Sequence, residues 1–162
     1  MIIRKERLTA EMPGDFVVFL IGMRVNRWWR VDKWLPVVFA MGRMLRELNS
    51  NRDLGFLGAS QWLGRTTIMV SYWRSIDQLF EYAKNRTASH LPAWRAFNQA
   101  VGTSGTVGIW HETYRVAPGD YESVYVNMPA FGLGEVGELV PAVGARQMGQ
   151  ERMRLSHETR KA

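Results

Sequence analysis

The chain has 162 residues, of which 46% are hydrophobic and 12% aromatic, and it contains no cysteine. This length and apolar content suffice for one substantial core, so we expect a single folded domain. A chain without cysteine has no disulfide, no thiolate nucleophile and no cysteine metal ligand, and its default location is cytoplasmic. The longest apolar run, Phe16–Met23, is too short for a transmembrane segment, and the residues before it do not resemble a secretory signal.

The formal net charge of +6 is concentrated in two segments. One is the C-terminal tail, where residues 145–162 carry five basic and two acidic side chains. The other is RVNRWWRVDKW, residues 24–34, in which arginine and tryptophan alternate. Such a segment can stack on nucleic-acid bases, lie at a lipid interface, sit under a partner subunit or cover a pocket. Because no recognised nucleic-acid-binding module surrounds it, we expect no nucleic-acid partner.

The first half of the chain predicts one strand, one helix and a hairpin. The apolar run Phe16–Val25 indicates a strand that is buried on both faces. Apolar residues at helical spacing then predict a helix over 34–48, with Asp32 as its N-cap. The β-type runs 54–63 and 66–73 follow, separated by a short turn, and predict an antiparallel pair.

The second half predicts a helical arm in two pieces and a fourth strand. Ser75 and Gln78 form a capping-box pattern that begins the first piece. The second piece runs from about His90 to Val101, and the strand is Val107–Val116.

A C-terminal arm begins at about residue 118 and is too apolar to be a solvated tail. It contains a further predicted strand at about 122–127, and it either packs on its own domain or reaches a partner subunit. Residues 144–162 lack a persistent apolar face, so we expect a disordered tail after a domain that spans 1–143.

The resulting β-α-β-β-α-β order is that of a ferredoxin-like α+β fold. The pattern predicts that neither face of the sheet is exposed to solvent, because the apolar residues of the first and third strands point to both sides. A second copy of the chain is the simplest cover, and we therefore expect a homodimer in which two sheets pair as a dimeric α/β barrel.

Familiar catalytic motifs are absent from the sequence. It has no glycine-rich nucleotide loop, no phosphate loop, no zinc-protease motif and no nucleophile elbow. One histidine stands out, because His90, Trp94 and Phe97 fall on a single stripe of the predicted helix. A buried imidazole in that position is either a hydrogen-bonded core residue or the axial ligand of a haem.

The stretches SYWRSIDQLFEYAKNRTASHLPAWRAFNQAVGTSGTVGIWHETYRV and YESVYVNMPAFGLG resemble a family of monooxygenase-like proteins of largely unknown function. That family belongs to the dimeric α/β barrel superfamily, and the resemblance runs from about Val17 to Ala142. The superfamily includes antibiotic-biosynthesis monooxygenases, haem-degrading monooxygenases, aldoxime dehydratases and chlorite dismutases, so the fold does not select one chemistry.

The resemblance implies a monooxygenase-like oxidoreductase that acts on a small hydrophobic or aromatic molecule in an apolar pocket. In the haem-degrading branch a histidine of the second helical arm holds the iron and an asparagine near the end of the first strand faces the pocket. His90 and Asn26 occupy similar places here, with Trp94 and Phe97 beside the macrocycle. The alternatives are a cofactor-free oxygenase, in which His90 or His111 assists substrate deprotonation, and a non-catalytic haem or small-molecule carrier. In the cofactor-free case the candidate lining residues are Trp62, Trp73, Trp94, Trp110 and His111.

Overall fold

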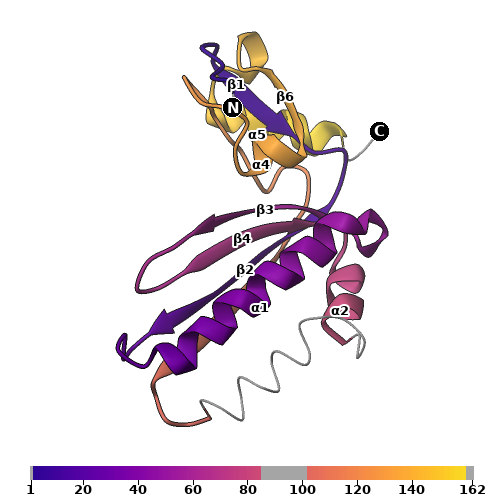
Figure 1. Cartoon of the computed structure of the whole chain (residues 1–162). Coiled ribbons are helices and arrows are strands. Elements are labelled where there is room, and N and C mark those ends of the chain that lie inside the picture. Colours follow the sequence, from indigo (N-terminus) through magenta and orange to yellow (C-terminus); the bar gives the residue numbers. More distant parts are fainter. Residues whose placement is uncertain (1, 85–101, 160–162) are drawn as a thin grey trace.

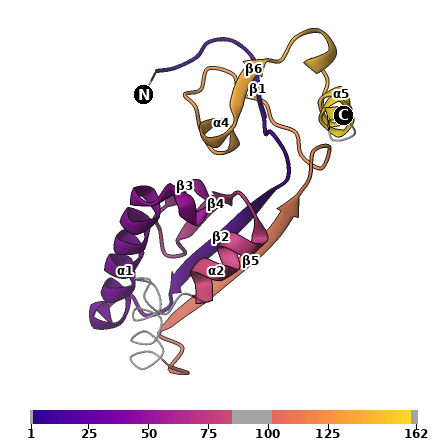
Figure 2. The same cartoon turned by 90° about the vertical axis from the view of Figure 1, so that its right-hand side faces the viewer.

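The computed structural model describes residues 2–84 and 102–159. They form a larger body, made of a sheet and two helices, and a smaller lobe that contains both ends of the described chain (Figures 1 and 2). The predicted helical segment from His90 to Val101, which includes Trp94 and Phe97, lies outside the described residues.

The body is built on a four-stranded antiparallel sheet in the order β3-β4-β2-β5. Its strands are β2 (Phe16–Val25), β3 (Phe56–Trp62), β4 (Ile68–Trp73) and β5 (Val107–Val116). The first and last of these coincide with the predicted strands. The strand order is that of the ferredoxin-like fold, so the predicted α+β class is confirmed.

Two helices, α1 (Val31–Ser50) and α2 (Ile76–Lys84), cover one face of the sheet (Figure 2). A short 3₁₀ turn, η1 (Arg52–Leu54), follows α1. The helices and the sheet share a core of Val17, Leu48, Phe56, Trp73, Leu79 and Tyr82. The burial of several large apolar and aromatic side chains in one cluster supplies most of the free energy that holds helices against a sheet.

The starts of the two helices show one correct prediction and one error. The Ser75 hydroxyl accepts a hydrogen bond from the Gln78 backbone N–H at 3.2 Å, so the predicted cap of α2 is confirmed. Asp32 does not cap α1, because the helix already begins at Val31. Its carboxylate instead accepts two hydrogen bonds from the Arg30 guanidinium, at 2.9 and 2.8 Å.

The face of the sheet opposite the helices is also apolar. Side chains alternate along a strand, so the register that directs Val17 and Met23 toward the helices directs Val18 and Leu20 to the other side. Val70 lies opposite Leu20 on the neighbouring strand and therefore shares that side. We call this surface the open face.

The smaller lobe joins the two ends of the chain. Strand β1 (Leu8–Glu11) pairs with β6 (Glu138–Pro141), and the lobe also contains α4 (Leu133–Val136), η2 (Gly144–Arg146) and α5 (Gly149–Thr159). The predicted strand at 122–127 is not formed; the structure has only an isolated bridge between Leu8 and Tyr125 there. Within the single chain, the C-terminal arm contacts the N-terminal strand β1.

Helix α5 differs from the disordered tail predicted for residues 144–162. Its exposed side chains are mostly polar, which is why the sequence shows no apolar stripe. One buried arginine, Arg152, holds the helix in place by pairing with Glu122. Among the described residues no helix combines the length and the apolar character needed to cross a bilayer.

Candidate functional site

Asn26 lies one residue beyond β2 and has a structural contact. Its side-chain amide donates a hydrogen bond to the Gly105 carbonyl at 3.0 Å, and its backbone N–H donates to Thr106 at 3.0 Å. These bonds fasten the loop after β2 to the loop before β5. The predicted role of Asn26 beside a cofactor would require its amide to turn away from Gly105.

His111 lies on the helix-facing side of β5, opposite Ile21 of β2. Its imidazole is exposed, and its ring centre is 5.9 Å from that of Phe19. Asn26 follows Val25, which pairs with Val107 at the far end of the same ladder. At about 3.3 Å per residue, five positions separate Asn26 from the level of His111 by about 16 Å. The structure therefore does not bring these two candidates together.

The tryptophans named as lining residues do not share one cavity, because the sheet separates them. Trp73 faces the helices, where it is 2% exposed and donates a hydrogen bond to the Ser71 hydroxyl at 3.1 Å. Trp62 and Trp110 point to the open face, while His111 points to the helix face. Trp73 is consequently a core residue, and the single lining set of the prediction is wrong.

The described residues enclose a hollow of about 360 Å³ on the open face, where the sheet meets the lobe. Residues of β2, β4 and β5 form its floor, and the segment 120–133 forms its wall. The lining is largely aromatic and aliphatic and comprises Phe16, Val18, Tyr72, Val116, Asp120, Tyr121, Glu122, Ser123, Tyr125, Phe131, Gly132 and Leu133. A concave apolar site with a few polar groups is the usual form of a small-molecule pocket.

Two tyrosines, Tyr72 and Tyr125, are among the polar residues that line the hollow. Burial, with a smaller effect of nearby Tyr125, raises the pKa of Tyr72 above its ordinary value. Tyr72 therefore keeps its proton at neutral pH and acts there as a hydrogen-bond donor. The Tyr125 hydroxyl accepts a hydrogen bond from the Gly134 backbone N–H at 2.9 Å, and its own proton stays available for donation.

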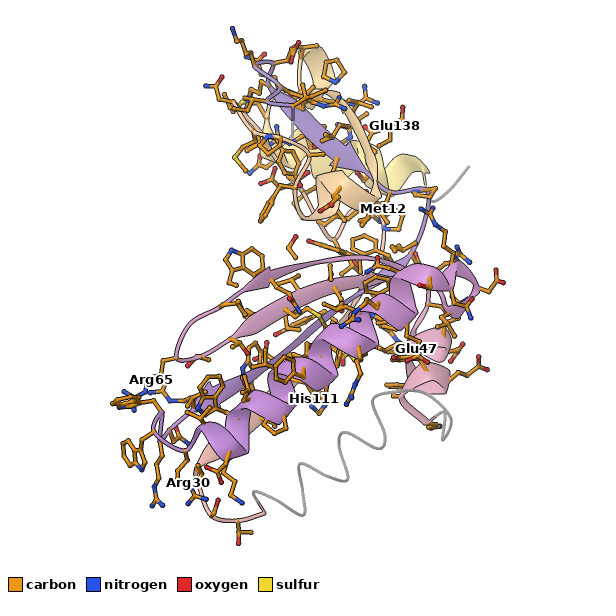
Figure 3. The ribbon with its side chains drawn as sticks, viewed as in Figure 1. Met12, Arg30, Glu47, Arg65, His111 and Glu138 are labelled. Atoms are coloured by element: carbon orange, nitrogen blue, oxygen red, sulfur yellow. The ribbon has the colours of Figure 1, made fainter. Side chains whose placement is uncertain are left out.

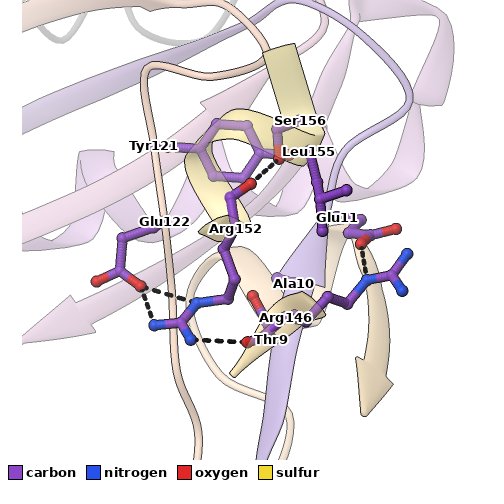
Figure 4. A pocket seen from close by; sticks show the side chains of 9 residues that line it. All are labelled: Thr9, Ala10, Glu11, Tyr121, Glu122, Arg146, Arg152, Leu155 and Ser156. Carbon is purple, nitrogen blue, oxygen red and sulfur yellow. Dashed lines mark hydrogen bonds and ion pairs between the residues drawn. The ribbon is translucent and has the colours of Figure 1, made fainter. Parts of the chain in front are cut away.

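Glu122, one of the residues that line the hollow, forms an ion pair with Arg152 of α5 (Figure 4). The Arg152 Nε donates to Glu122 at 3.1 Å, and its Nη1 donates to the carbonyls of Arg146 and Gln147, both at 2.9 Å. A second pair links Arg146 to Glu11 at 2.6 Å. Since Glu122 belongs to the wall and Arg152 to α5, this ion pair links the C-terminal helix to the wall of the hollow.

Sequence reasoning did not find this hollow, although part of its signal was present. Val18 and Tyr72 were visible as apolar positions on the second face of their strands, and the stretch YESVYVN supplied two more tyrosines. What the sequence did not show was that β1 pairs with β6 and thereby brings residues 120–133 over the sheet. That contact joins residues more than a hundred positions apart.

The described residues do not by themselves fit a haem. The lining of the hollow contains no histidine, and His111 lies on the opposite face of the sheet with an exposed ring. No cluster of three metal-binding side chains occurs in the part of the chain that the structure describes. The hypothesis that His90 ligates haem therefore rests on residues outside the described ranges.

Comparisons with known proteins identify a related family, one curated relative and several similar solved structures. The sequence profile of the family described as "Monooxygenase af470-like" matches residues 16–133. Monooxygenase af470 of Aspergillus fumigatus is 32% identical over 168 aligned residues, which cover 90% of this chain and 58% of that protein. The chain thus spans little more than half the length of this relative.

Two solved structures resemble the body of the chain. One is SnoaB, a cofactor-independent oxygenase from Streptomyces nogalater, with 13% identity, a TM-score of 0.45, and coverage of 62% of this chain and 91% of SnoaB. The other is a dimeric protein of unknown function and ferredoxin-like fold from Bacteroides fragilis, with 11% identity, a TM-score of 0.43, and coverage of 61% and 96%.

Proposed function

Because the chain belongs to the Monooxygenase af470-like family, we propose that it is a monooxygenase-like oxidoreductase acting on a small hydrophobic or aromatic molecule. The observation that carries the proposal is the apolar hollow of about 360 Å³, which is lined in part by tyrosine side chains. Aromatic walls bind a flat apolar substrate and exclude water, while one or two donors orient its oxygen atoms.

We propose that this reaction needs no haem or metal. An electron-rich phenol that has lost its proton can react with dioxygen directly. One oxygen atom then becomes a new carbonyl of the product quinone, and the other leaves as water with the two hydrogens that the phenol gives up. In this scheme the protonated Tyr72 donates a hydrogen bond to the substrate oxygen and stabilises its negative charge. Tyr72 is thus a stabiliser of the anion and not the base that forms it.

A second copy of the chain is proposed to cover the open face. Val18, Leu20 and Val70 lie there partly exposed, beside the mouth of the hollow. An apolar sheet face of this kind is more stable when another sheet packs on it. In such a homodimer the partner's sheet closes the hollow and keeps water from the reacting anion.

The experiment measures dioxygen uptake with a panel of naphthols and polycyclic phenols, using protein treated with a chelator and shown by absorption to be free of haem. Val116→Trp fills the hollow, since Val116 is one of its lining residues. Tyr114→Trp is the matched control, because Tyr114 is on the same strand and face, two residues away and outside the lining. Since that face is also the proposed dimer interface, light scattering of both variants must first give the mass of wild type.

We expect wild type and Tyr114→Trp to consume dioxygen with at least one phenol, and Val116→Trp to lose at least nine-tenths of that rate. Equal rates for the two tryptophan variants would place the reaction elsewhere. Tight binding of the phenols by wild type without uptake of dioxygen would favour a carrier over an enzyme.

A further inference from the structure

One end of the body presents an exposed cluster of tryptophan, leucine and basic side chains that the proposed function does not use. It consists of the loop 26–30 between β2 and α1, the turn 63–66 between β3 and β4, and the adjoining residues Arg24, Val31 and Lys33, and we call it the basic tip. Figure 3 shows Arg30 and Arg65 together at this end of the molecule.

Hydrogen bonds join the two segments of the basic tip. The Val25 backbone N–H donates to the Arg65 carbonyl at 2.8 Å, and the Arg24 Nη1 donates to the Thr66 hydroxyl at 2.7 Å. The Trp34 indole donates to the Trp28 carbonyl at 3.0 Å and thereby fixes the loop to the first turn of α1. The tip is therefore a defined surface and not two independent loops.

The apolar side chains of the tip project into solvent. Trp28 is 73% exposed, Trp29 is 61% exposed and Leu63 is 81% exposed. The two indoles meet edge to face, with ring centres 6.2 Å apart and planes at 81°. Three large apolar side chains exposed this far on one tip are costly in water unless a partner covers them.

The charge of the tip is strongly positive. It carries five basic residues, Arg24, Arg27, Arg30, Lys33 and Arg65, and the one acidic residue next to them in the sequence is Asp32. Asp32 pairs with Arg30 and Lys33, whereas no carboxylate among the described residues pairs with Arg24, Arg27 or Arg65. The sequence of residues 85–101 contains neither aspartate nor glutamate, so that segment cannot neutralise them.

We propose that the basic tip docks on the surface of a bilayer that contains anionic phospholipid. Tryptophan favours the level of the lipid headgroups, Leu63 reaches the acyl boundary, and the arginines attract the negative headgroups. A nucleic-acid partner would account for the arginines and tryptophans but not for Leu63, because an aliphatic side chain does not stack on bases.

The docking surface is remote from the hollow, so the two proposals can fail separately. The tip is at the Val25 end of β2, whereas the hollow contains Phe16 at the other end. Nine residues of strand span about 30 Å. A molecule bound by its tip would therefore keep the hollow away from the membrane surface.

Vesicle flotation tests the proposal with the full chain. Wild type should float with vesicles of 30% phosphatidylserine in phosphatidylcholine and float far less with phosphatidylcholine alone. Each basic residue near an anionic surface contributes about fivefold to partitioning. Arg27→Glu should thus lower the partition coefficient by about 25-fold, and Leu63→Ser by about tenfold.

Two matched controls carry the same chemical changes elsewhere. Arg115→Glu reverses an exposed arginine at the other end of β5, and Val143→Ser removes an exposed apolar side chain in the lobe. Both should bind vesicles within about twofold of wild type, because neither lies in the tip. Oxygen uptake by the tip variants in solution should equal that of wild type.

Three results would overturn the proposal. The first is wild type that does not float with anionic vesicles at low salt. The second is an equal loss of flotation in Arg27→Glu and Arg115→Glu, which would reflect net charge alone. The third is binding of a single-stranded oligonucleotide that the tip variants abolish while vesicle binding is absent, which would assign the surface to nucleic acid.

Discussion

Arg152 in the C-terminal helix and Glu122 in the wall of the hollow form an ion pair in which the arginine side chain is 7% exposed. The same guanidinium also reaches the carbonyls of Arg146 and Gln147, so its donors are largely satisfied within the lobe. A residue of the polar C-terminal segment therefore holds the segment that encloses the proposed substrate.

Arg152→Ala should destabilise the protein. Removing the guanidinium leaves the Glu122 carboxylate and two carbonyls without their partner, a loss of about 2–3 kcal/mol for a largely buried arginine, with the half-exposed carboxylate reducing the penalty. The midpoint of thermal unfolding should fall by about 5–10 °C. Gln150→Ala, at an exposed position of the same helix, should change it by less than 2 °C or so. An Arg152→Ala midpoint equal to that of Gln150→Ala would show that the contacts of Arg152 with Glu122 and the two carbonyls do not stabilise the fold.

The protein should lose stability in alkaline solution. Burial raises the pKa of Tyr72, and burial together with Glu47 raises that of Tyr82. Both phenols stay protonated in the folded state above the ordinary tyrosine pKa of about 10, while the unfolded chain loses those protons. Their contribution to the free energy of unfolding is thus complete below about pH 10 and declines as pH rises above it. Denaturant titrations at pH 8 and pH 11 measure the change. A larger free energy of unfolding at pH 11 would contradict the assigned burial.

Gly22→Ala should destabilise the sheet more than the same change at a nearby glycine. A Cβ at Gly22 would collide with the Thr67 carbonyl and lie 2.8 Å from the Trp110 Nε1, whereas a Cβ at Gly108 would meet nothing within 4 Å. Overpacking of this kind costs about 1–3 kcal/mol. Chemical denaturation of the two variants gives the comparison directly. Similar midpoints for both would mean that Thr67 and Trp110 can move aside at little cost.

The open face should mediate self-association. Light scattering of dilute wild type should give twice the chain mass of 18.6 kDa. Val70→Asp places a charge on the open face, partly exposed and opposite Leu20, and should yield monomers because a buried unpaired charge opposes sheet packing. Ser50→Asp, at the exposed end of α1, should remain dimeric. A monomeric wild type at micromolar concentration would exclude the proposed dimer.

Local sequence patterns predicted the body of the fold well. The ranges of β2 and β5 were visible because each is a compact run bounded by turn residues, and the start of α2 followed from Ser75 and its capping partner Gln78. These signals are carried by neighbouring residues, so one sequence contains them.

The lobe and the hollow were not predictable in the same way. The pairing of Leu8 with Pro141 and the contact of Arg152 with Glu122 depend on residues that are distant in the chain. From the sequence alone, Arg152 would be predicted to be an ordinary exposed arginine, because the burial of a charged residue depends on its partners and not on the local pattern. For the same reason the sequence did not separate the faces on which Trp73 and Trp110 lie.

The roles of His90, Trp94 and Phe97 lie outside the described residues and stay predictions. Their helical spacing supports an inward-facing histidine, and a haem is the cofactor that such a residue would ligate. Haemin titration of wild type and His90→Ala separates this hypothesis from a structural role of the histidine. If His90 ligates haem, wild type gives a Soret signal with one haemin per chain and His90→Ala does not.

The central claim is that oxygenation occurs in the hollow without haem, and the most direct measurement compares dioxygen uptake before and after haemin is added. Haem-free wild type should consume one dioxygen per quinone formed, His90→Ala should retain most of that rate, and Val116→Trp should lose it. Uptake that appears only after haemin is added, and that His90→Ala abolishes, would contradict the account.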